Sequence, residues 1–259
     1  MTNDAASELI VERPAEHVLL LRLNRPARLN ALSKPLLRTL GAALVEAERD
    51  DQVRVVVLTG DDRAFSAGAD LKEMETSDLP SFAEIGRLTA WKTVERFSKP
   101  MVSAVNGYAY GGGLELALLT DIVVAGENAR FATPEIKVGM FPGDGGTQRL
   151  PRSIGKARAM QMILSGEPID ARTALAWGLV SEVFPTAETV SRAVALAALV
   201  ARHSPLAARM AKEEVKMAFE KPLDESLSLE RKMLLFQSED RREGVRAFVE
   251  KRAPRWMGR

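Results

Sequence analysis

Two glutamates, Glu115 and Glu135, are the residues of this chain best suited to chemistry, because each stands beside a turn. Glu115 follows the glycine run at 111–113, and Glu135 precedes the glycine-rich run at 139–146. If both carboxylates reach one pocket, burial and mutual repulsion raise the proton affinity of one while the other stays ionised. Such a pair acts as acid and base together, which is what moving water across a double bond requires.

The chain offers few other catalytic groups. It has no cysteine, and its two histidines, His17 and His203, have no partner at metal-ligand spacing. The glycines at 111–113 do not complete a dinucleotide fingerprint, because Leu116 stands where the third glycine is needed. Residues 155–157 do not complete a P-loop. We therefore expect no metal site and no nucleotide triphosphate site.

Length and charge exclude several other classes of protein. A chain of 259 residues suffices for one large α/β domain. Lys and Arg number 36 against 35 Asp and Glu, and this balance gives no electrostatic footprint for nucleic acid or an anionic membrane. The N-terminus lacks the apolar stretch of a signal peptide, and no apolar run approaches the roughly 20 residues that span a bilayer. We expect a soluble, cytoplasmic protein.

Repeated βα units are expected to position the two glutamates. Residues 7–12 and 17–24 predict an opening hairpin. Ser33 is a candidate N-cap for a helix with Pro35 in its first turn. Apolar strands are expected at 53–58, 100–105 and 121–125, with helices at about 78–97 and from Gly113 or Leu114 between them. Right-handed crossovers then give a parallel α/β sheet.

Beyond residue 155 the pattern predicts helices almost throughout. They are expected at 156–165, 171–177, 187–202, 204–220, 223–236 and 239–251. Pro205 and Pro222 stand at the starts of two of them, where proline is tolerated. Such a segment more often covers a core or forms an oligomer than makes a separate catalytic domain.

Two strand-to-helix turns complete the candidate site, one within residues 65–72 and the other within 106–115. Their small residues let backbone approach a ligand closely. If helices begin at Leu71 and near Gly113, the N–H groups of their first turns point between them and make an oxyanion hole. The alternative is that both are simply tight turns, with Glu115 favouring its helix dipole.

These segments resemble one family. FSAGADLK at 65–72, AVNGYAYGGGLELA at 104–117, and PE at 134–135 with PGDGGTQRL at 142–150 are similar to the enoyl-CoA hydratase/isomerase (crotonase) family. The resemblance covers almost the whole chain, including residues 171–183 and 240–244. Within the family, residues 125–131 and 201–207 are most similar to hydratases of the phenylacetate-pathway type.

The resemblance implies an architecture. It is a crotonase-like α/β fold, a spiral of ββα units with a helical C-terminal layer. Residues 1–195 then form the core with the catalytic site, and residues 196–259 form a helical trimerisation region. The expected assembly is a homo-oligomer, either a trimer or a dimer of trimers.

The resemblance also implies a reaction. The backbone N–H groups of Ala69 and Gly112 hold the thioester oxygen of an acyl-CoA, and Glu115 and Glu135 are the catalytic pair. We favour Glu115 as the activator of water and Glu135 as the proton donor to C2, although a coupled pair leaves this assignment open. The chain is expected to be an enoyl-CoA hydratase, a hydro-lyase that makes 3-hydroxyacyl-CoA without metal and without a cofactor beyond the substrate's coenzyme A.

Coenzyme A contacts are implied at further positions. Ala67, Ala69, Asp70, Leu71, Lys72 and Gly112 match the family's contacts near the thioester and phosphates. Phe248 and Lys251 match positions that in relatives hold the adenosine 3′-phosphate end, sometimes from a neighbouring subunit. Core phenylalanines and exposed lysines are common, so these two positions are equally open to a structural role.

Three questions stay open at this point. Asp144 stands where the family more often has alanine; we expect it to cap the turn or pair with a cation, yet it leaves the reaction type open. A Δ3,Δ2-enoyl-CoA isomerase and an inactive acyl-CoA-binding member are the alternatives to a hydratase. The acyl-chain preference is also open, since Arg87, Trp91 and Lys92 either meet a distal carboxylate or face solvent.

Overall fold

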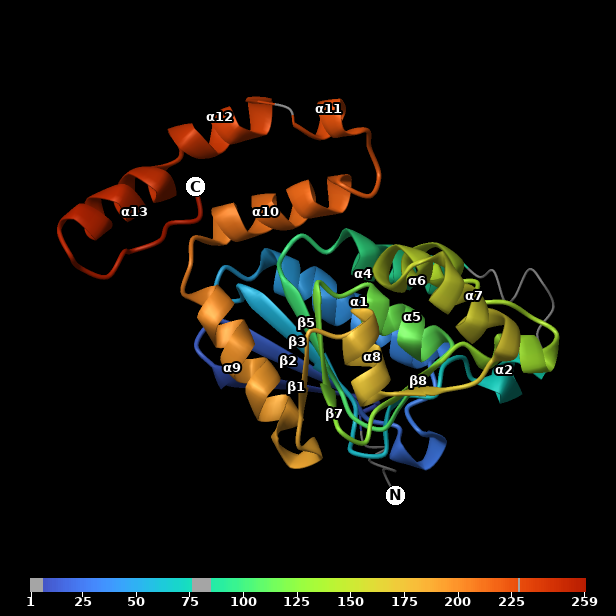
Figure 1. Cartoon of the computed structure of the whole chain (residues 1–259). Coiled ribbons are helices and arrows are strands. Elements are labelled where there is room, and N and C mark those ends of the chain that lie inside the picture. The colour runs from blue at the N-terminus through green and yellow to red at the C-terminus, as the bar shows by residue number, and fades with distance from the viewer. Residues whose placement is uncertain (1–6, 76–84, 228) are drawn as a thin grey trace, which may run out of the picture.

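A six-stranded sheet lies at the centre of the chain, for which a computed structural model describes residues 7–75, 85–227 and 229–259 (Figure 1). The strand order is β1-β2-β3-β5-β7-β10. β1 (Leu9–Ala15) and β2 (Val18–Leu23) pair antiparallel, which confirms the predicted hairpin. The remaining strands pair parallel and are β3 (Val55–Thr59), β5 (Met101–Val105), β7 (Ile122–Gly126) and β10 (Glu182–Phe184).

A second sheet of four short strands gives the fold its spiral form. Its order is β4 (Ala64–Ser66), β6 (Tyr108–Tyr110), β8 (Arg130–Ala132) and β9 (Ile169–Asp170), with β9 antiparallel. One strand of each sheet and then a helical segment follow in turn, in the units β3-β4-α2, β5-β6-α5 and β7-β8-η2. The predicted fold class, a spiral of ββα units, is confirmed.

Side-chain alternation along β3 shows how the first sheet is covered. Val55 and Val57 face one cluster of buried side chains, to which α9 (Thr189–Ala201) contributes Ala193 and Ala197. Val56 and Leu58 face the other cluster, which contains the apolar stripe of α1 (Lys34–Arg49). A strand covered on both faces reads as a continuous apolar run, and this is why β3 was predictable from sequence.

The helices largely follow the predicted ranges. Ser33 caps α1, because its Oγ accepts a hydrogen bond from the Leu36 N–H at 3.2 Å. The second predicted helix is described as α4 (Ile85–Arg96), while residues 76–84 lie outside the described residues. Confirmed helices follow at α7 (Lys156–Ser165), α8 (Ala171–Trp177), α9, α10 (Pro205–Met217) and α13 (Glu239–Val249).

Two helix predictions need correction. Residues 146–154, which the sequence pattern left without a helix, form α6 (Gly146–Ile154); glycine at its start and Pro151 inside it weaken the pattern. The single helix expected at 223–236 is wrong, because α11 (Leu223–Ser226) and α12 (Leu229–Gln237) are separate helices. Leu227, with φ −81° and ψ 14°, has left the helical conformation.

Helices α10–α13 form a C-terminal arm that extends away from the two sheets (Figure 1). Lys212, on α10, anchors the arm: its Nζ donates to the Lys99 carbonyl oxygen at 2.8 Å and lies 2.9 Å from Asp121 Oδ2. The expected boundary between residues 195 and 196 falls inside α9, which packs on the first sheet along its length. The arm therefore begins after α9.

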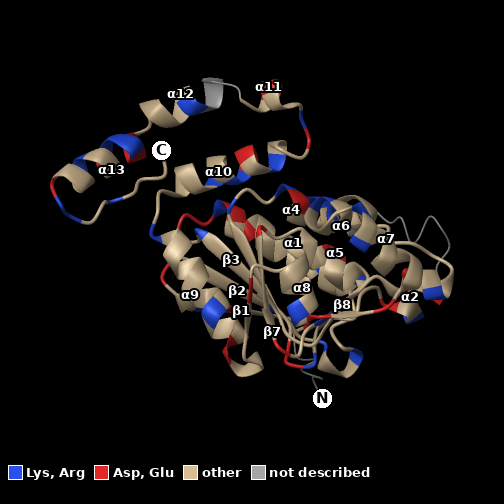
Figure 2. Ribbon diagram, viewed as in Figure 1, with Lys and Arg blue, Asp and Glu red and all other residues tan. Residues whose placement is uncertain are grey.

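The surface carries both signs of charge. Figure 2 shows lysines and arginines interspersed with acidic residues over the helices on the face in view. In the part of the chain that the structure describes, no helix has the length and apolar character needed to cross a membrane.

Candidate active site

Neighbouring strands of the second sheet bring the predicted site together. β4 pairs with β6, and β6 pairs with β8, all parallel. The segments that follow these strands therefore emerge at one edge of the sheet. They are the turn to α2 (Leu71–Glu75), the turn to α5 (Gly112–Leu118), and η2 (Pro134–Val138), which carries Glu135.

The turns that carry Ala69 and Gly112 approach closely. Gly68 has φ +93°, and a Cβ atom on it would lie 3.2 Å from the Gly112 nitrogen and 2.6 Å from the Tyr110 carbonyl oxygen. A Cβ on Gly112 would lie 3.6 Å from the Ala69 nitrogen. Among the described residues, neither the Ala69 nor the Gly112 N–H donates a hydrogen bond. The two groups are thus placed to receive one acceptor atom.

Glu115 is held by the loop that contains Asp144 and Gly146. The residue is 2% exposed, and its Oε1 accepts hydrogen bonds from the Asp144 N–H at 2.8 Å and the Gly146 N–H at 2.7 Å. Burial raises the pKa of Glu115 to about 7, with smaller contributions from the charges of Asp144 and Glu135, while the two N–H donors oppose the rise. A carboxyl with a pKa near neutrality can both take and give a proton at working pH.

Glu135 lies against the start of the helix that carries Glu115. A Cβ atom on Gly111 would stand 2.9 Å from Glu135 Oε1, and the Gly111 carbonyl oxygen accepts the Glu115 N–H at 3.0 Å. Burial, and then the charge of Asp144, raise the pKa of Glu135. Its Oε2 is buried without a hydrogen-bond partner in the described part of the chain. Two carboxyl groups of raised proton affinity thus meet beside one turn.

Asp144 is part of this constellation. Its N–H binds Glu115, and its carbonyl oxygen accepts a hydrogen bond from Arg149 Nη1 at 3.0 Å. The charge of its side chain favours the protonated forms of Glu115 and Glu135. Asp144 therefore influences the two glutamates through both its backbone and its charge.

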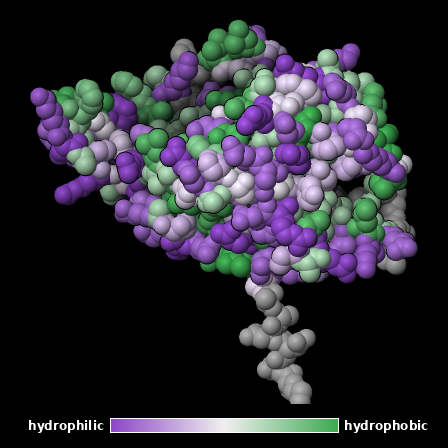
Figure 3. Space-filling view, turned by 60° about the horizontal axis from the view of Figure 1, so that its bottom comes forward, coloured by the Kyte–Doolittle hydropathy of each residue, from purple (hydrophilic) through white to green (hydrophobic). Residues whose placement is uncertain are grey.

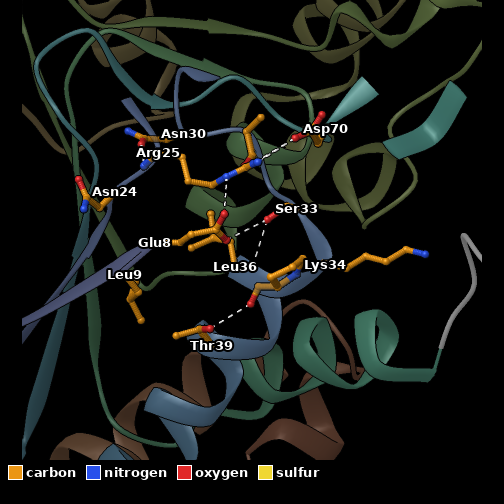
Figure 4. A network of polar contacts seen from close by, with 12 residues as sticks. Glu8, Leu9, Asn24, Arg25, Asn30, Ser33, Lys34, Leu36, Thr39 and Asp70 are labelled. Atoms are coloured by element: carbon orange, nitrogen blue, oxygen red, sulfur yellow. Dashed lines mark hydrogen bonds and ion pairs between the residues drawn. The ribbon is translucent and has the colours of Figure 1, made fainter. Parts of the chain in front are cut away.

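A polar network that the sequence did not reveal holds the turn with Ala69 (Figure 4). Arg25 donates to Asp70 Oδ2 from both Nη atoms at 3.1 Å, and its Nε lies 2.9 Å from Glu8 Oε1. Asp70 also accepts the Lys72 N–H at 3.2 Å. Beside it, the Leu32 N–H donates to the Gly68 carbonyl oxygen at 2.7 Å. Nothing in the sequence around Arg25 predicts that it bonds to Asp70 and Glu8.

The predicted coenzyme A contacts separate into two places. Ala67 and Ala69 are partly exposed at the turn, while Leu71 and Lys72 are exposed on α2. Asp70 directs its carboxylate to Arg25 and to the start of α2. Phe248, which is 86% exposed on α13, and Lys251 lie on the arm, on the other side of the chain from α2 (Figure 1). The structure does not bring these two residues to the site of the same chain.

Residues considered for the acyl pocket also differ among themselves. Trp91 is 7% exposed and packs in the core, whereas Lys92 is exposed. The side chain of Arg87 lies outside the described residues. Of the two residues whose side chains are described, Lys92 faces solvent and Trp91 does not.

The fold is an α/β spiral whose candidate site places two carboxyl groups beside two N–H groups, and comparisons with known proteins identify its family. A family model described as enoyl-CoA hydratase/isomerase matches residues 13–259. The 2,3-dehydroadipyl-CoA hydratase of Escherichia coli is 51% identical over 98% of this chain and 100% of its own length. The mitochondrial enoyl-CoA hydratase of Pongo abelii is 48% identical over 90% of this chain and 81% of its own.

A solved structure agrees with these relatives. The enoyl-CoA hydratase from Bacillus anthracis superposes with a TM-score of 0.93 and 36% identity, covering 98% of this chain and all of that one. The chain belongs to the enoyl-CoA hydratase/isomerase family. The prediction of an enzyme of the enoyl-CoA hydratase class is confirmed at this level, since full-length relatives at about half identity carry that name.

Proposed function

We propose that this chain adds water across the 2,3 double bond of a 2-enoyl-CoA thioester and forms a 3-hydroxyacyl-CoA. The observation that carries the proposal is the position of two carboxyl groups of raised pKa, the buried Glu115 and the partly buried Glu135, near the N–H groups of Ala69 and Gly112. The first pair moves protons, and the second stabilises the negative charge that develops on the thioester oxygen.

In the proposed reaction each group has its own role. Glu115, held in position by the N–H groups of Asp144 and Gly146, accepts a proton from water as the water oxygen bonds to C3. The electrons of the double bond move toward the thioester, whose oxygen is held by the N–H groups of Ala69 and Gly112. Glu135 gives its proton to C2. A proton transfer from Glu115 to Glu135, directly or through water, then restores the starting state.

An isomerase is the nearest alternative, because one shuttling base is enough to move a double bond. The presence of a second carboxyl group of raised pKa favours hydration. The test is to incubate the protein with crotonyl-CoA in ¹⁸O-labelled water and follow the conjugated-thioester absorbance. We expect the absorbance to fall and the product to contain labelled oxygen at C3. Loss of a 3-enoyl-CoA substrate without any hydration of 2-enoyl-CoA would contradict the proposal.

We further propose 2,3-dehydroadipyl-CoA as a substrate, since the E. coli relative named for this substrate is 51% identical over 98% of this chain. Lys92, an exposed cation on α4, is proposed to meet the distal carboxylate. A panel of crotonyl, longer enoyl and dehydroadipyl thioesters tests this choice, with Lys92→Met as the variant. A kcat/KM for dehydroadipyl-CoA no higher than for an uncharged thioester of equal length would contradict it.

We propose that the arm forms a trimer or a dimer of trimers. Apolar side chains that are more than half exposed gather on it, and Figure 3 shows hydrophobic surface along the upper edge where the arm lies. They are Val215, Phe219, Leu223, Leu227, Met233, Leu234, Phe236, Val245, Phe248 and Val249. Such a surface marks a protein contact. Analytical ultracentrifugation is expected to give three or six chains, and a monomer at micromolar concentration would contradict the proposal.

Three narrower expectations accompany the function. Ala67, Asp70, Leu71 and Lys72 are proposed to line the coenzyme A path, and Phe248 and Lys251 to reach the adenosine end in a neighbouring copy. No cofactor or metal beyond the substrate's coenzyme A is proposed, so dialysis against EDTA should leave kcat unchanged. A cytoplasmic location stays a prediction from sequence.

A further inference from the structure

We propose that Arg149 is a positioning residue for Glu115, which it controls through the peptide group between Asp144 and Gly145. The inference rests on the proposed hydration reaction. The hydrogen bonds of the Arg149 side chain go to Asp144 and Glu95, away from Ala69 and Gly112, and no role for Arg149 is predicted from the sequence. Its contacts connect α4 to the loop that holds the catalytic carboxylate.

The guanidinium group of Arg149 is built into that loop. Its Nη1 donates to the Asp144 carbonyl oxygen at 3.0 Å. Gly145 has φ +106°, and a Cβ atom there would stand 1.8 Å from Arg149 Nη1. The side chain therefore fills the space that any other residue at position 145 would need. The position of the guanidinium group therefore depends on glycine at 145, and the guanidinium group in turn holds the Asp144 carbonyl oxygen of the loop.

The two N–H donors to Glu115 flank this glycine, and they are fixed differently. The Gly145 carbonyl oxygen accepts the N–H groups of Gln148 and Arg149 at 3.0 and 2.8 Å, so the start of α6 fixes the peptide group that ends in the Gly146 N–H. The Asp144 carbonyl oxygen is held instead by the Arg149 side chain. The Asp144 N–H belongs to the preceding peptide group, between Gly143 and Asp144, so this donor depends on Arg149 through the Asp144 Cα atom that joins the two groups.

Glu95 anchors the arginine from the other end. Arg149 Nη2 lies 2.5 Å from Glu95 Oε1, so the planar guanidinium group bridges a carboxylate on α4 and a carbonyl oxygen in the loop. Glu95 stands between the buried residues Val94 and Phe97, and its own carbonyl oxygen accepts Lys216 Nζ from the arm at 3.1 Å. Its backbone is therefore well fixed.

The consequence for catalysis concerns the ionised form of Glu115. Asp144 and Glu135 face Glu115 and disfavour its negative charge, whereas the Asp144 and Gly146 N–H groups favour it. Losing the Asp144 donor removes a hydrogen bond to a charged group and releases Glu115 from its orientation. Fewer molecules then carry a correctly aligned base at neutral pH.

The test compares variants of Arg149 and Glu95 with a matched control on the same helix. Arg149→Met is expected to lower kcat on crotonyl-CoA by about 10-fold or more, with KM within about twofold, and to move the acidic limb of the pH–rate profile to higher pH. Arg152→Met, which removes an exposed arginine bonded within α6, should leave both unchanged.

Glu95 variants separate geometry from charge. Glu95→Ala removes the partner that holds the guanidinium group. If Arg149 positions Glu115, this variant should have a lower kcat, and the acidic limb of its pH–rate profile should move to higher pH. Removing a negative charge by itself moves the limb to lower pH. Glu95→Gln keeps an acceptor for Arg149 and is expected to retain most of the activity.

Several results would overturn the inference. They are an unchanged kcat in Arg149→Met, an equal loss in Arg152→Met, or a shift of the limb to lower pH in Glu95→Ala. If Arg149→Met fails to fold, as its melting temperature would reveal, the Glu95 pair decides the question alone. A wild-type protein inactive on every 2-enoyl-CoA would overturn the proposed function and this inference with it.

Discussion

Gly146→Ala is a substitution that perturbs Glu115 directly. A Cβ atom at this position would stand 2.9 Å from Glu115 Oε1, 3.1 Å from Glu115 Cγ and 2.8 Å from Pro142 Cβ. The methyl group therefore meets the carboxylate that the Gly146 N–H holds. Gly146 does not have a left-handed φ and begins α6, where alanine is a better helix former than glycine. We expect the fold to survive.

The size of the effect follows from the hydrogen bonds at stake. Displacing Oε1 weakens bonds to a charged group, each worth about 1.5–3 kcal/mol. One such loss in the transition state corresponds to about a 10- to 150-fold lower kcat. KM should change little, because the N–H groups of Ala69 and Gly112 are untouched.

Gly143→Ala is the matched control in the same loop. The nearest atom to a Cβ there is the Phe141 carbonyl oxygen at 3.9 Å, and its φ is not left-handed. The assay is steady-state hydration of crotonyl-CoA, with the melting temperature measured for both variants. Wild-type kcat in Gly146→Ala, or an equal loss in Gly143→Ala, would refute the assigned position of Glu115.

Three further predictions concern the surrounding structure. Gly68→Ala, at φ +93° with its Cβ 2.6 Å from the Tyr110 carbonyl oxygen, should part the two N–H groups and lower kcat by about 100-fold or more; unchanged kinetics would argue against this oxyanion hole. Arg25→Met leaves Asp70, 11% exposed, without its arginine and should cost about 3–5 kcal/mol of unfolding free energy in urea titrations; a change under about 1 kcal/mol would show the network to be dispensable. The pKa of Glu115 rises from 4.5 to about 7 on folding, so its contribution to stability is present at low pH and lost as pH rises through about 7. Unfolding free energies at pH 5 and 8 should therefore differ less in Glu115→Gln than in the wild type, and an identical difference would contradict the raised pKa.

Strong local signals explain which elements the sequence could predict. Val55–Thr59 is an apolar run buried on both faces, and the helix after Ser33 has both a cap and an apolar stripe. The second sheet could not be found this way, because strands of three residues such as Ala64–Ser66 are too short to display alternation. Its strands became understandable only once their pairing placed the three segments with the candidate site residues at one edge of the sheet.

In the candidate site, too, some residues were indicated by local sequence while others were apparent only in the folded structure. The sequence singled out Glu115 and Glu135 by their positions beside glycine-rich turns, and family resemblance implied Ala69 and Gly112; the structure brings these residues together, and their catalytic roles stay predictions. The supporting contacts were not predictable, because they join residues far apart in the sequence. Arg25 reaches Asp70 across 45 positions, and Arg149 reaches Glu95 across 54. An arginine in the sequence carries no signal of such a partner until the chain has folded.

The central claim is that two carboxyl groups act as one unit in hydration. The most direct measurement is kcat for crotonyl-CoA in Glu115→Gln, Glu135→Gln and the double variant, with melting temperatures showing that each is folded. We predict a loss of at least about 100-fold in each single variant and little further loss in the double variant, because groups that act together are not additive. Full activity in either single variant, or losses that multiply in the double variant, would contradict the account.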